Sequence, residues 1–330
     1  DINNIIIYID DNKMPNLYRI YKNKNGTIKK DIIHEYNEQI STTPEVMKEV
    51  CEKVFADYPA QSYGLIYWSH GEGWKPMPQT SSTRWVGQDK SGEMTDYTNI
   101  DELKNVLESS VPHLDFLLYD ACFMMSIEAS YALRDEVDYI IASPTEIPGP
   151  GAPYNTIIPI MFKEGNTAVD IANAYFNAYN QQYNDGVENS DSHWSAGVSI
   201  SVLKTSALST LAHATNQAIR QATNIDINTL KTKIFDYDKR PPYSSSKVGY
   251  YDMVQLIKNI CLETNFLTWK SAFDDAMVYY QTTPMNYSSY SGLFSMNGTY
   301  GLTHFLPSSN QSLNESYATT EWYSAALLFQ

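Results

Sequence analysis

Two short apolar segments of this chain end in side chains that can perform thiol chemistry. Residues 63–69 run into His70, and residues 115–121 run into Cys122. Each segment has the length and composition of a buried strand. The carboxyl ends of parallel strands share one edge of a sheet, and ligands bind at that edge. If the two strands are neighbours, His70 and Cys122 meet there, and a histidine beside a cysteine is the minimum equipment for a thiol nucleophile.

The residues around this pair suggest the rest of a thiol site. We expect Cys122 to open a helix, whose N-terminus would stabilise the thiolate. His70 would either take the thiol proton as a general base or hold it in an ion pair. The backbone N–H groups of Gly71 and Cys122 would form an oxyanion hole, where one donor typically contributes about 3 kcal/mol.

A structural role is the alternative for each residue taken singly. Free cysteines are often buried in cores, and a histidine at a strand end often only bonds a carbonyl. The two residues stand 52 positions apart (122 − 70), with one predicted helix between their strands. That spacing suits two strands joined by a crossover connection and favours the functional reading.

The segments that must position this pair alternate between strand and helix patterns. Strands are predicted at 5–9, 17–21, 28–36, 63–69, 115–119 and 139–142, and helices from 44, at 99–110 and at 124–137. Residues 71–95 and 143–154 are rich in Gly, Pro, Ser and Thr and are predicted to be loops. The alternation predicts an α/β fold with a mostly parallel sheet flanked by helices on both faces.

The second half of the chain is more helical. Helices are predicted at 167–183, 206–223 and 252–280, with strands at 195–203 and 302–306. The polar, Pro/Ser-rich stretch 238–247 is predicted to be a surface loop. We expect residues 1–205 to form the core and residues 206–330 a mainly helical extension packed on it, within one continuous domain.

Composition excludes several classes of function. The net charge of −15 disfavours nucleic-acid binding through phosphate neutralisation. No apolar run reaches the roughly 18 residues of a membrane-spanning helix. The cysteines at 51, 122 and 261 form no C-x-x-C pair, and no H-x-x-x-H occurs, so no metal site is predicted. A start shortly before a strand suggests a processed or trimmed chain.

Taken together, the motifs resemble those of the clan CD cysteine peptidases, most closely the clostripain family (C11). The matching segments are WSHGEGW at 68–74, YDACFM at 119–124 and IASPTEIPG at 141–149. Their order and spacing fit over roughly residues 1–205. The resemblance implies a caspase-like (caspase–hemoglobinase) fold and endopeptidase activity, with His70 as general base or acid and Cys122 as nucleophile.

The resemblance also implies a preference for Arg or Lys before the cleaved bond (P1). Asp120 matches the acidic residue that reads the basic side chain, which would form a charge-assisted pair. A helix N-cap is the alternative role for Asp120. Relatives often carry adjacent acidic residues after the next strand. Here Pro144 and Thr145 stand there and Glu146 follows, so Glu146 is the second candidate, and this departure weakens the Arg/Lys assignment.

Activation, cofactors and location are implied by the resemblance alone. Family precursors are commonly activated by cleavage within a loop, and Arg84 in the 71–95 segment is the predicted self-cleavage site; an ordinary surface charge is the alternative. Some relatives use calcium, but the chain has no D-x-D-x-D-G loop, so no cofactor is predicted. The expected partner is a peptide or protein substrate with basic residues. The resemblance implies an exported protein, at the cell surface, in the periplasm or extracellular, and the oligomeric state is not predicted.

Two other functions fit the same residues. The first is an inactive or zymogen-locked clan CD relative that binds peptides. The second is a different thiol hydrolase or acyltransferase on a flavodoxin-like sheet. The presence of His70, Gly71 and Cys122 together favours an active peptidase, since a binding module does not need all three.

Overall fold

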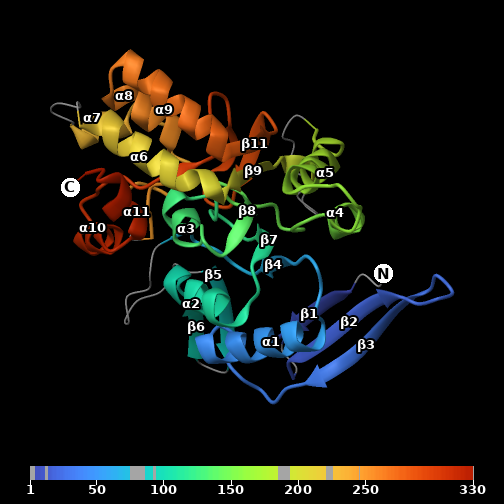
Figure 1. The fold of residues 1–330 in the computed structure, drawn as a ribbon. Coiled ribbons are helices and arrows are strands. Elements are labelled where there is room, and N and C mark those ends of the chain that lie inside the picture. Colours follow the sequence, from blue (N-terminus) through green and yellow to red (C-terminus); the bar gives the residue numbers. More distant parts are fainter. Residues whose placement is uncertain are drawn as a thin grey trace.

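A computed structural model describes residues 4–11, 14–74, 86–91, 94–184, 194–220, 226–244 and 246–329. Its centre is a five-stranded sheet in the order β11-β9-β8-β7-β4 (Figure 1). These strands are β4 (Gly64–Trp68), β7 (Leu114–Asp120), β8 (Val137–Ala142), β9 (Ser199–Lys204) and β11 (Met277–Thr282). β4, β7 and β8 are parallel, whereas β9 and β11 pair antiparallel. The expected α/β class is confirmed, with a mixed sheet.

Alternate strand residues enter two hydrophobic clusters, one on each face of the sheet. Leu117 and Leu203 belong to the larger cluster, and Leu118 and Val202 belong to the smaller one. The smaller cluster includes residues of α4 (Tyr154–Met161) and α5 (Ala168–Asn180). The larger one includes residues of α2 (Ile100–Ser110), α3 (Ile127–Ala132), α6 (Leu208–Ile219), α8 (Met253–Ile260) and α9 (Glu263–Ala276).

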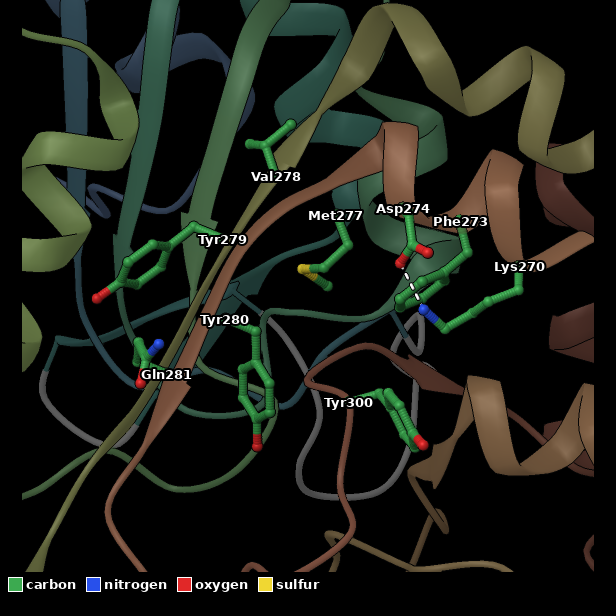
Figure 2. Close-up of a pocket in the computed structure, with 9 residues that line it drawn as sticks. All are labelled: Lys270, Phe273, Asp274, Met277, Val278, Tyr279, Tyr280, Gln281 and Tyr300. Atoms are coloured by element: carbon green, nitrogen blue, oxygen red, sulfur yellow. Dashed lines mark hydrogen bonds and ion pairs between the residues drawn. The ribbon is translucent and has the colours of Figure 1, made fainter. Parts of the chain in front are cut away.

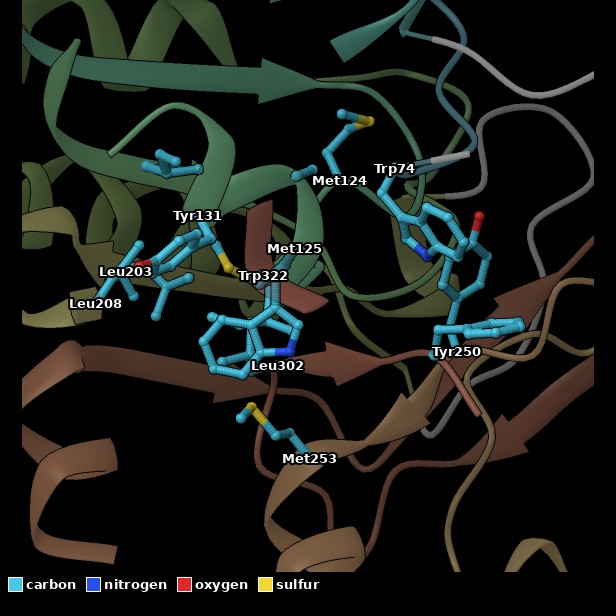
Figure 3. Packing of buried hydrophobic residues seen from close by; sticks show 14 of the residues in the cluster. Trp74, Met124, Met125, Tyr131, Leu203, Leu208, Tyr250, Met253, Leu302 and Trp322 are labelled. Atoms are coloured by element: carbon cyan, nitrogen blue, oxygen red, sulfur yellow. The ribbon is translucent and has the colours of Figure 1, made fainter. Parts of the chain in front are cut away.

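The larger cluster draws on both halves of the sequence. Figure 3 shows Met124 and Met125 in one cluster with Trp322 and Leu302, which come from the last 30 residues, and Met125 is the methionine drawn nearer Trp322. Among these, Trp322 and Leu302 are fully buried. The extension therefore completes the core on this face of the sheet, while the division at residue 205 stays a prediction.

Smaller elements surround the sheet. β1 (Ile5–Ile9), β2 (Asn16–Lys22) and β3 (Ile28–Glu35) form a separate antiparallel sheet near α1 (Pro44–Asp57), far from α6, α8 and α9 in Figure 1. The remaining elements are α7 (Ile227–Lys231), β10 (Tyr251–Asp252), β12 (Met285–Ser288), β13 (Gly292–Ser295), β14 (Thr303–His304), α10 (Gln311–Ala318) and α11 (Glu321–Ala326).

The prediction of a loop over 71–95 is wrong for its last part. β5 (Val86–Ser91) and β6 (Met94–Thr98) form an antiparallel hairpin in which Val86 pairs with Thr98. Both residues are fully buried. The polar composition of the hairpin conceals a strand pattern, because its packing depends on partners distant in sequence.

The helix predicted at 124–137 is also shorter than expected. α3 begins only at Ile127, after the N-cap Ser126, whose Oγ accepts from the Ala129 N–H at 3.3 Å. Before it, the N–H groups of Phe123 and Met125 donate to carbonyls on the segment after β8, each at 3.0 Å. Cys122 therefore lies in a loop, and the expectation that it opens a helix is wrong.

The 252–280 segment divides into three elements instead of one helix. α8 ends at Ile260, α9 ends at Ala276, and the chain continues as β11. The Val278-Tyr279-Tyr280 run of β-branched and aromatic residues favours a strand over a helix. This strand extends the central sheet beside β9.

The first turn of α3 contains a buried carboxyl group. Glu128 of α3 is 2% exposed, and its Oε1 accepts from the Phe305 N–H at 2.8 Å. Burial raises the pKa of Glu128 from 4.5 to about 8. The folded chain therefore retains a proton on Glu128 that the unfolded chain loses near pH 4.5. The free energy of unfolding accordingly decreases as pH rises from 4.5 to about 8.

We expect Glu128→Gln to gain stability relative to wild type as pH increases from 5 to 8. The relative gain should be about 3 kcal/mol across this range, since one pKa unit corresponds to 1.36 kcal/mol. Calorimetric melting at several pH values measures it, with Glu315→Gln on the surface as the control. A difference in Tm that does not change with pH would contradict the assignment.

Within the described part of the chain, none of the helices is long and apolar enough to cross a membrane.

Candidate active site

The register of two parallel strands brings the predicted catalytic residues to one edge of the sheet. Trp68 of β4 pairs with Asp120 of β7. His70 stands two residues after Trp68 and Cys122 two residues after Asp120, so the two residues occupy equivalent positions beyond neighbouring strands. The Ser69 N–H donates to the Asp120 carbonyl at 3.4 Å, which continues the contact past the strand ends. The juxtaposition expected from the sequence is therefore present in the backbone.

Gly71 allows the two loops to approach this closely. A Cβ atom at position 71 would lie 2.7 Å from the Cys122 carbonyl oxygen and 2.9 Å from the Cβ of Ala121. Neither distance is possible for a real side chain without backbone movement. Glycine is thus required here by space, which agrees with the prediction that its backbone lies beside the nucleophile.

The histidine loop is held by the β5 strand. The Gly87 N–H donates to the His70 carbonyl, and the Gln88 N–H donates to Ser69 Oγ, both at 3.0 Å. The His70 residue itself is exposed. The imidazole is therefore accessible on a loop whose backbone is fixed.

The cysteine loop is bent sharply at the residue after the thiol. Phe123 has φ = 60°, a left-handed conformation that is unusual for a bulky residue. The Ile147 N–H donates to Cys122 Sγ at 3.4 Å. The turn and this contact fix the sulfur near the segment that follows β8.

The Cys122 thiol is a weak acid in this structure. Burial, followed by the negative charges of Glu146, Glu72 and Asp120, raises its pKa from 9.0 to about 12, and only the Ile147 N–H opposes this. The pKa lowering expected from a helix N-terminus is absent because α3 starts five residues later. At neutral pH the proton stays on sulfur, which favours the general-base role of His70 over a preformed ion pair.

Alkylation of Cys122 by iodoacetamide should therefore accelerate about tenfold per pH unit between pH 7 and 9, because only the thiolate reacts. Cys51 provides an internal reference, since burial raises its pKa to about 11. Peptide-mapped rates measure both thiols in one sample. A plateau for Cys122 below pH 8 would contradict the neutral thiol and indicate an ion pair with His70.

Asp120, two residues before Cys122, is a fully buried carboxyl group. Its Oδ2 accepts from the Ala152 N–H at 2.9 Å and from the Tyr154 hydroxyl at 2.7 Å. Its Oδ1 has no hydrogen-bond partner among the described residues. Burial raises the pKa of Asp120. The helix N-cap alternative is wrong, because Ser126 caps α3.

Three tyrosines of α4 and α5 contribute to the surroundings of this carboxylate, and Tyr154 contacts it directly. Tyr154 donates to it directly, and Tyr179 donates to the Gly151 carbonyl at 2.6 Å. The buried Tyr175 hydroxyl finds no partner in the described part of the chain. Sequence analysis missed these tyrosines, because the Tyr154–Asp120 contact spans 34 residues and no local pattern marks any of the three.

Glu146 brings a second carboxylate near the thiol. Its Oε1 accepts from the Ser289 N–H at 3.2 Å and from Ser289 Oγ at 2.5 Å. Its Oε2 is buried without a partner among the residues described. The negative charges of both Asp120 and Glu146 raise the pKa of Cys122, and Glu146 directly precedes Ile147, whose N–H contacts the sulfur.

Other predicted features lie elsewhere or outside the described residues. Arg84 lies outside them. Among the residues described, no group of three His, Cys, Asp or Glu side chains could hold a metal ion. A surface groove of about 370 Å³ follows β11 at the opposite end of the sheet order from β4 (Figure 2), and none of the predicted site residues lines it.

Comparison with known proteins agrees with the resemblance in the sequence. Residues 1–328 match the Clostripain family, Peptidase C11. No curated protein matches the chain. Among solved structures, a secreted C11 cysteine protease from Bacteroides thetaiotaomicron in complex with an irreversible peptide inhibitor is 38% identical, with a TM-score of 0.88, covering 98% of this chain and 88% of that one.

Two further structures are similar. A cysteine protease from B. fragilis is 40% identical, with a TM-score of 0.64, covering 73% of this chain and 96% of that one. An inactive zymogen C11 protease from Parabacteroides distasonis is 28% identical, with a TM-score of 0.79, covering 98% of this chain and 87% of that one. These matches favour the peptidase reading over a flavodoxin-like acyltransferase.

Proposed function

The chain belongs to the clostripain family and is a cysteine endopeptidase, and we propose that His70 and Cys122 are its catalytic dyad. The observation that carries this proposal is the β4–β7 register, which sets the two residues at matched positions beyond neighbouring strands. The close approach of Gly71 to the Cys122 backbone supports it further.

In the proposed mechanism, Cys122 Sγ attacks the peptide carbonyl carbon while His70 takes the thiol proton. The N–H groups of Gly71 and Cys122 stabilise the oxyanion that forms. His70 then gives the proton to the departing amine, and a thioester remains on the sulfur. Water, deprotonated by His70, attacks the thioester and releases the acid product and the free thiol.

We further propose that the substrate carries Lys or Arg at P1. Asp120 Oδ1 and Glu146 Oε2 are buried oxygens without partners in the described structure. Unpaired buried carboxylate oxygens are costly, and a cationic side chain would satisfy them. The chain's net charge of −15 also attracts basic peptides.

A basic P1 group would also assist the nucleophile. The charges of Asp120 and Glu146 raise the pKa of Cys122. A cation bound between these carboxylates offsets that effect, so transfer of the thiol proton to His70 becomes easier. The proposed specificity and the proposed activation of the thiol thus depend on the same two side chains.

Initial rates on fluorogenic peptides that differ only at P1 test this proposal. Hydrolysis should occur with Lys or Arg and be negligible with Asp, Asn or Leu. Cleavage after a neutral or acidic residue would keep the dyad and overturn the pocket. No cleavage by the full chain, either fresh or after prolonged incubation, would overturn the proposal of an active form.

A zymogen-locked form is the second candidate for the state of this chain. The neutral thiol of Cys122 and the fully buried Asp120 favour it, and one similar structure is an inactive zymogen. We propose that cleavage after Arg84 relieves the lock. Intact mass after incubation should show two fragments divided after residue 84, whereas the control variant Cys122→Ala should stay uncut. A single uncut chain in both samples would contradict the proposal.

Location and cofactors complete the proposal. One similar protease is described as secreted, and we propose that this chain is also exported; fractionation of the source culture tests it. The proposed steps use only side chains and backbone groups of the chain itself. Hydrolysis should therefore continue at an unchanged rate in EDTA, whereas a loss restored by calcium would show a metal requirement.

A further inference from the structure

A buried arginine from the second half of the chain contacts the histidine loop. Arg240 is 2% exposed, and its Nη1 donates to Glu72 Oε2 at 2.6 Å. Its Nε donates to Asp238 Oδ1 at 2.7 Å. Glu72 stands two residues after His70. The sequence-based expectation of a surface loop over 238–247 is wrong at these positions, because the charges pair with one another inside the protein.

The same segment contacts the cysteine loop. The ring of Tyr250 stacks on that of Phe123, the residue after Cys122, with centroids 5.0 Å apart and planes at 16°. The Arg240 guanidinium lies 5.3 Å from the centre of the Phe123 ring. The Tyr250 hydroxyl donates to the Glu72 carbonyl. Arg240 and Tyr250 therefore touch both loops at once.

The segment that supplies these groups is itself fixed. Asp238 Oδ2 accepts from the N–H groups of Val248 and Gly249 at 2.9 and 3.2 Å. The Lys247 ammonium lies 2.8 Å from Asp236 Oδ2. These contacts join the two ends of the segment to each other, so Arg240 stands on a braced turn when it pairs with Glu72.

We propose that Arg240 is a positioning residue that sets the His70–Gly71 backbone against Cys122 by holding both loops. This inference rests on the proposed dyad. Without the guanidinium, Glu72 and Asp238 are left as close negative charges inside the protein, and the ring of Phe123 keeps Tyr250 but loses its cationic neighbour. The β5 contacts would still hold residues 69 and 70, but the loop would lose its support at Glu72 and could shift there. A displacement of about 1 Å in an active site can cost about 10²-fold in rate.

The test compares Arg240→Met with a matched control. Arg134 makes a similar ion pair far along the chain, since its Nη1 lies 2.5 Å from Glu321 Oε2 and its guanidinium lies over the Tyr131 ring. Arg134→Met removes a link between the two halves of the chain without touching either loop. Each variant is assayed well below its own melting temperature.

We expect Arg240→Met to lower kcat at least about 30-fold with KM within about threefold, whereas Arg134→Met changes kcat by less than about twofold. Lysine keeps the charge but donates from a single nitrogen, so kcat of Arg240→Lys should be about fivefold higher than that of Arg240→Met. If both methionine variants lose stability alike and keep kcat, Arg240 is merely structural and the inference is overturned.

Hydrogen exchange separates this inference from the proposed function. In Arg240→Met, amides of residues 69–74 and 121–125 should exchange faster than in wild type, while Arg134→Met leaves them unchanged. A wild type that hydrolyses no peptide would overturn the proposed function, and unchanged exchange in both loops would overturn the positioning role. If Arg240→Met does not fold, Glu72→Gln, which weakens the same contact, replaces it in both measurements.

Discussion

Replacing Cys122 with alanine is expected to lower peptide hydrolysis at least about 10³-fold, because the thiol forms the covalent bond to the substrate. His70→Ala should cost a similar factor. The double variant should be no worse than either single one, since the two groups act as a unit. Initial rates on a peptide with Lys at P1 measure all three variants.

The other two cysteines provide the control. Cys51 lies on α1 and Cys261 follows α8, and neither is in the loops that carry the proposed dyad. Their alanine variants should keep kcat within about twofold. Hydrolysis that survives in Cys122→Ala but disappears in Cys261→Ala would move the nucleophile and refute the assignment.

Replacing Asp120 with asparagine is expected to reduce kcat/KM for Lys or Arg peptides by about 10² to 10³, because a buried charge pair loses one partner. Glu146→Gln should cost less, since Glu146 is only half-buried whereas Asp120 is fully buried. A peptide with a neutral P1 residue should be affected less than about threefold. Equal losses on basic and neutral peptides would contradict a role in specificity.

The same Asp120→Asn variant, although less active, should be more stable than wild type and should have a more reactive Cys122 thiol. Burial raises the pKa of Asp120, so its ionised form weakens the fold as pH increases. Asp120→Asn should therefore melt higher than wild type by a margin that grows with pH. Its Cys122 should also alkylate faster, since one of the charges that raise the thiol pKa is removed. A lower Tm at neutral pH would contradict this reading.

The sequence allowed the sheet edge and its main residues to be predicted. β4 and β7 are short apolar strands, and their carboxyl ends determine where His70 and Cys122 lie whatever the details of the loops. Asp120 could be placed for the same reason. The local sequence pattern was sufficient to predict the position of a residue wherever that position is fixed by the end of a strand.

The surroundings of the thiol could not be predicted, because they depend on distant partners. The backbone of Phe123 and Met125 bonds to the segment after β8, which prevents α3 from starting at Cys122. The Pro/Ser-rich composition around Arg240 indicated a surface loop, yet its charges pair with Glu72, 168 positions away. A pattern of charges alone does not reveal such a partner.

Covalent labelling tests the central claim most directly. The chain is treated with an irreversible peptidyl ketone inhibitor that carries Lys at P1, and the modified residue is identified by peptide mass mapping. The account predicts one adduct, on Cys122, that forms much more slowly in His70→Ala and in Asp120→Asn. An adduct on Cys51 or Cys261, or equal labelling by an inhibitor with Asp at P1, would contradict it.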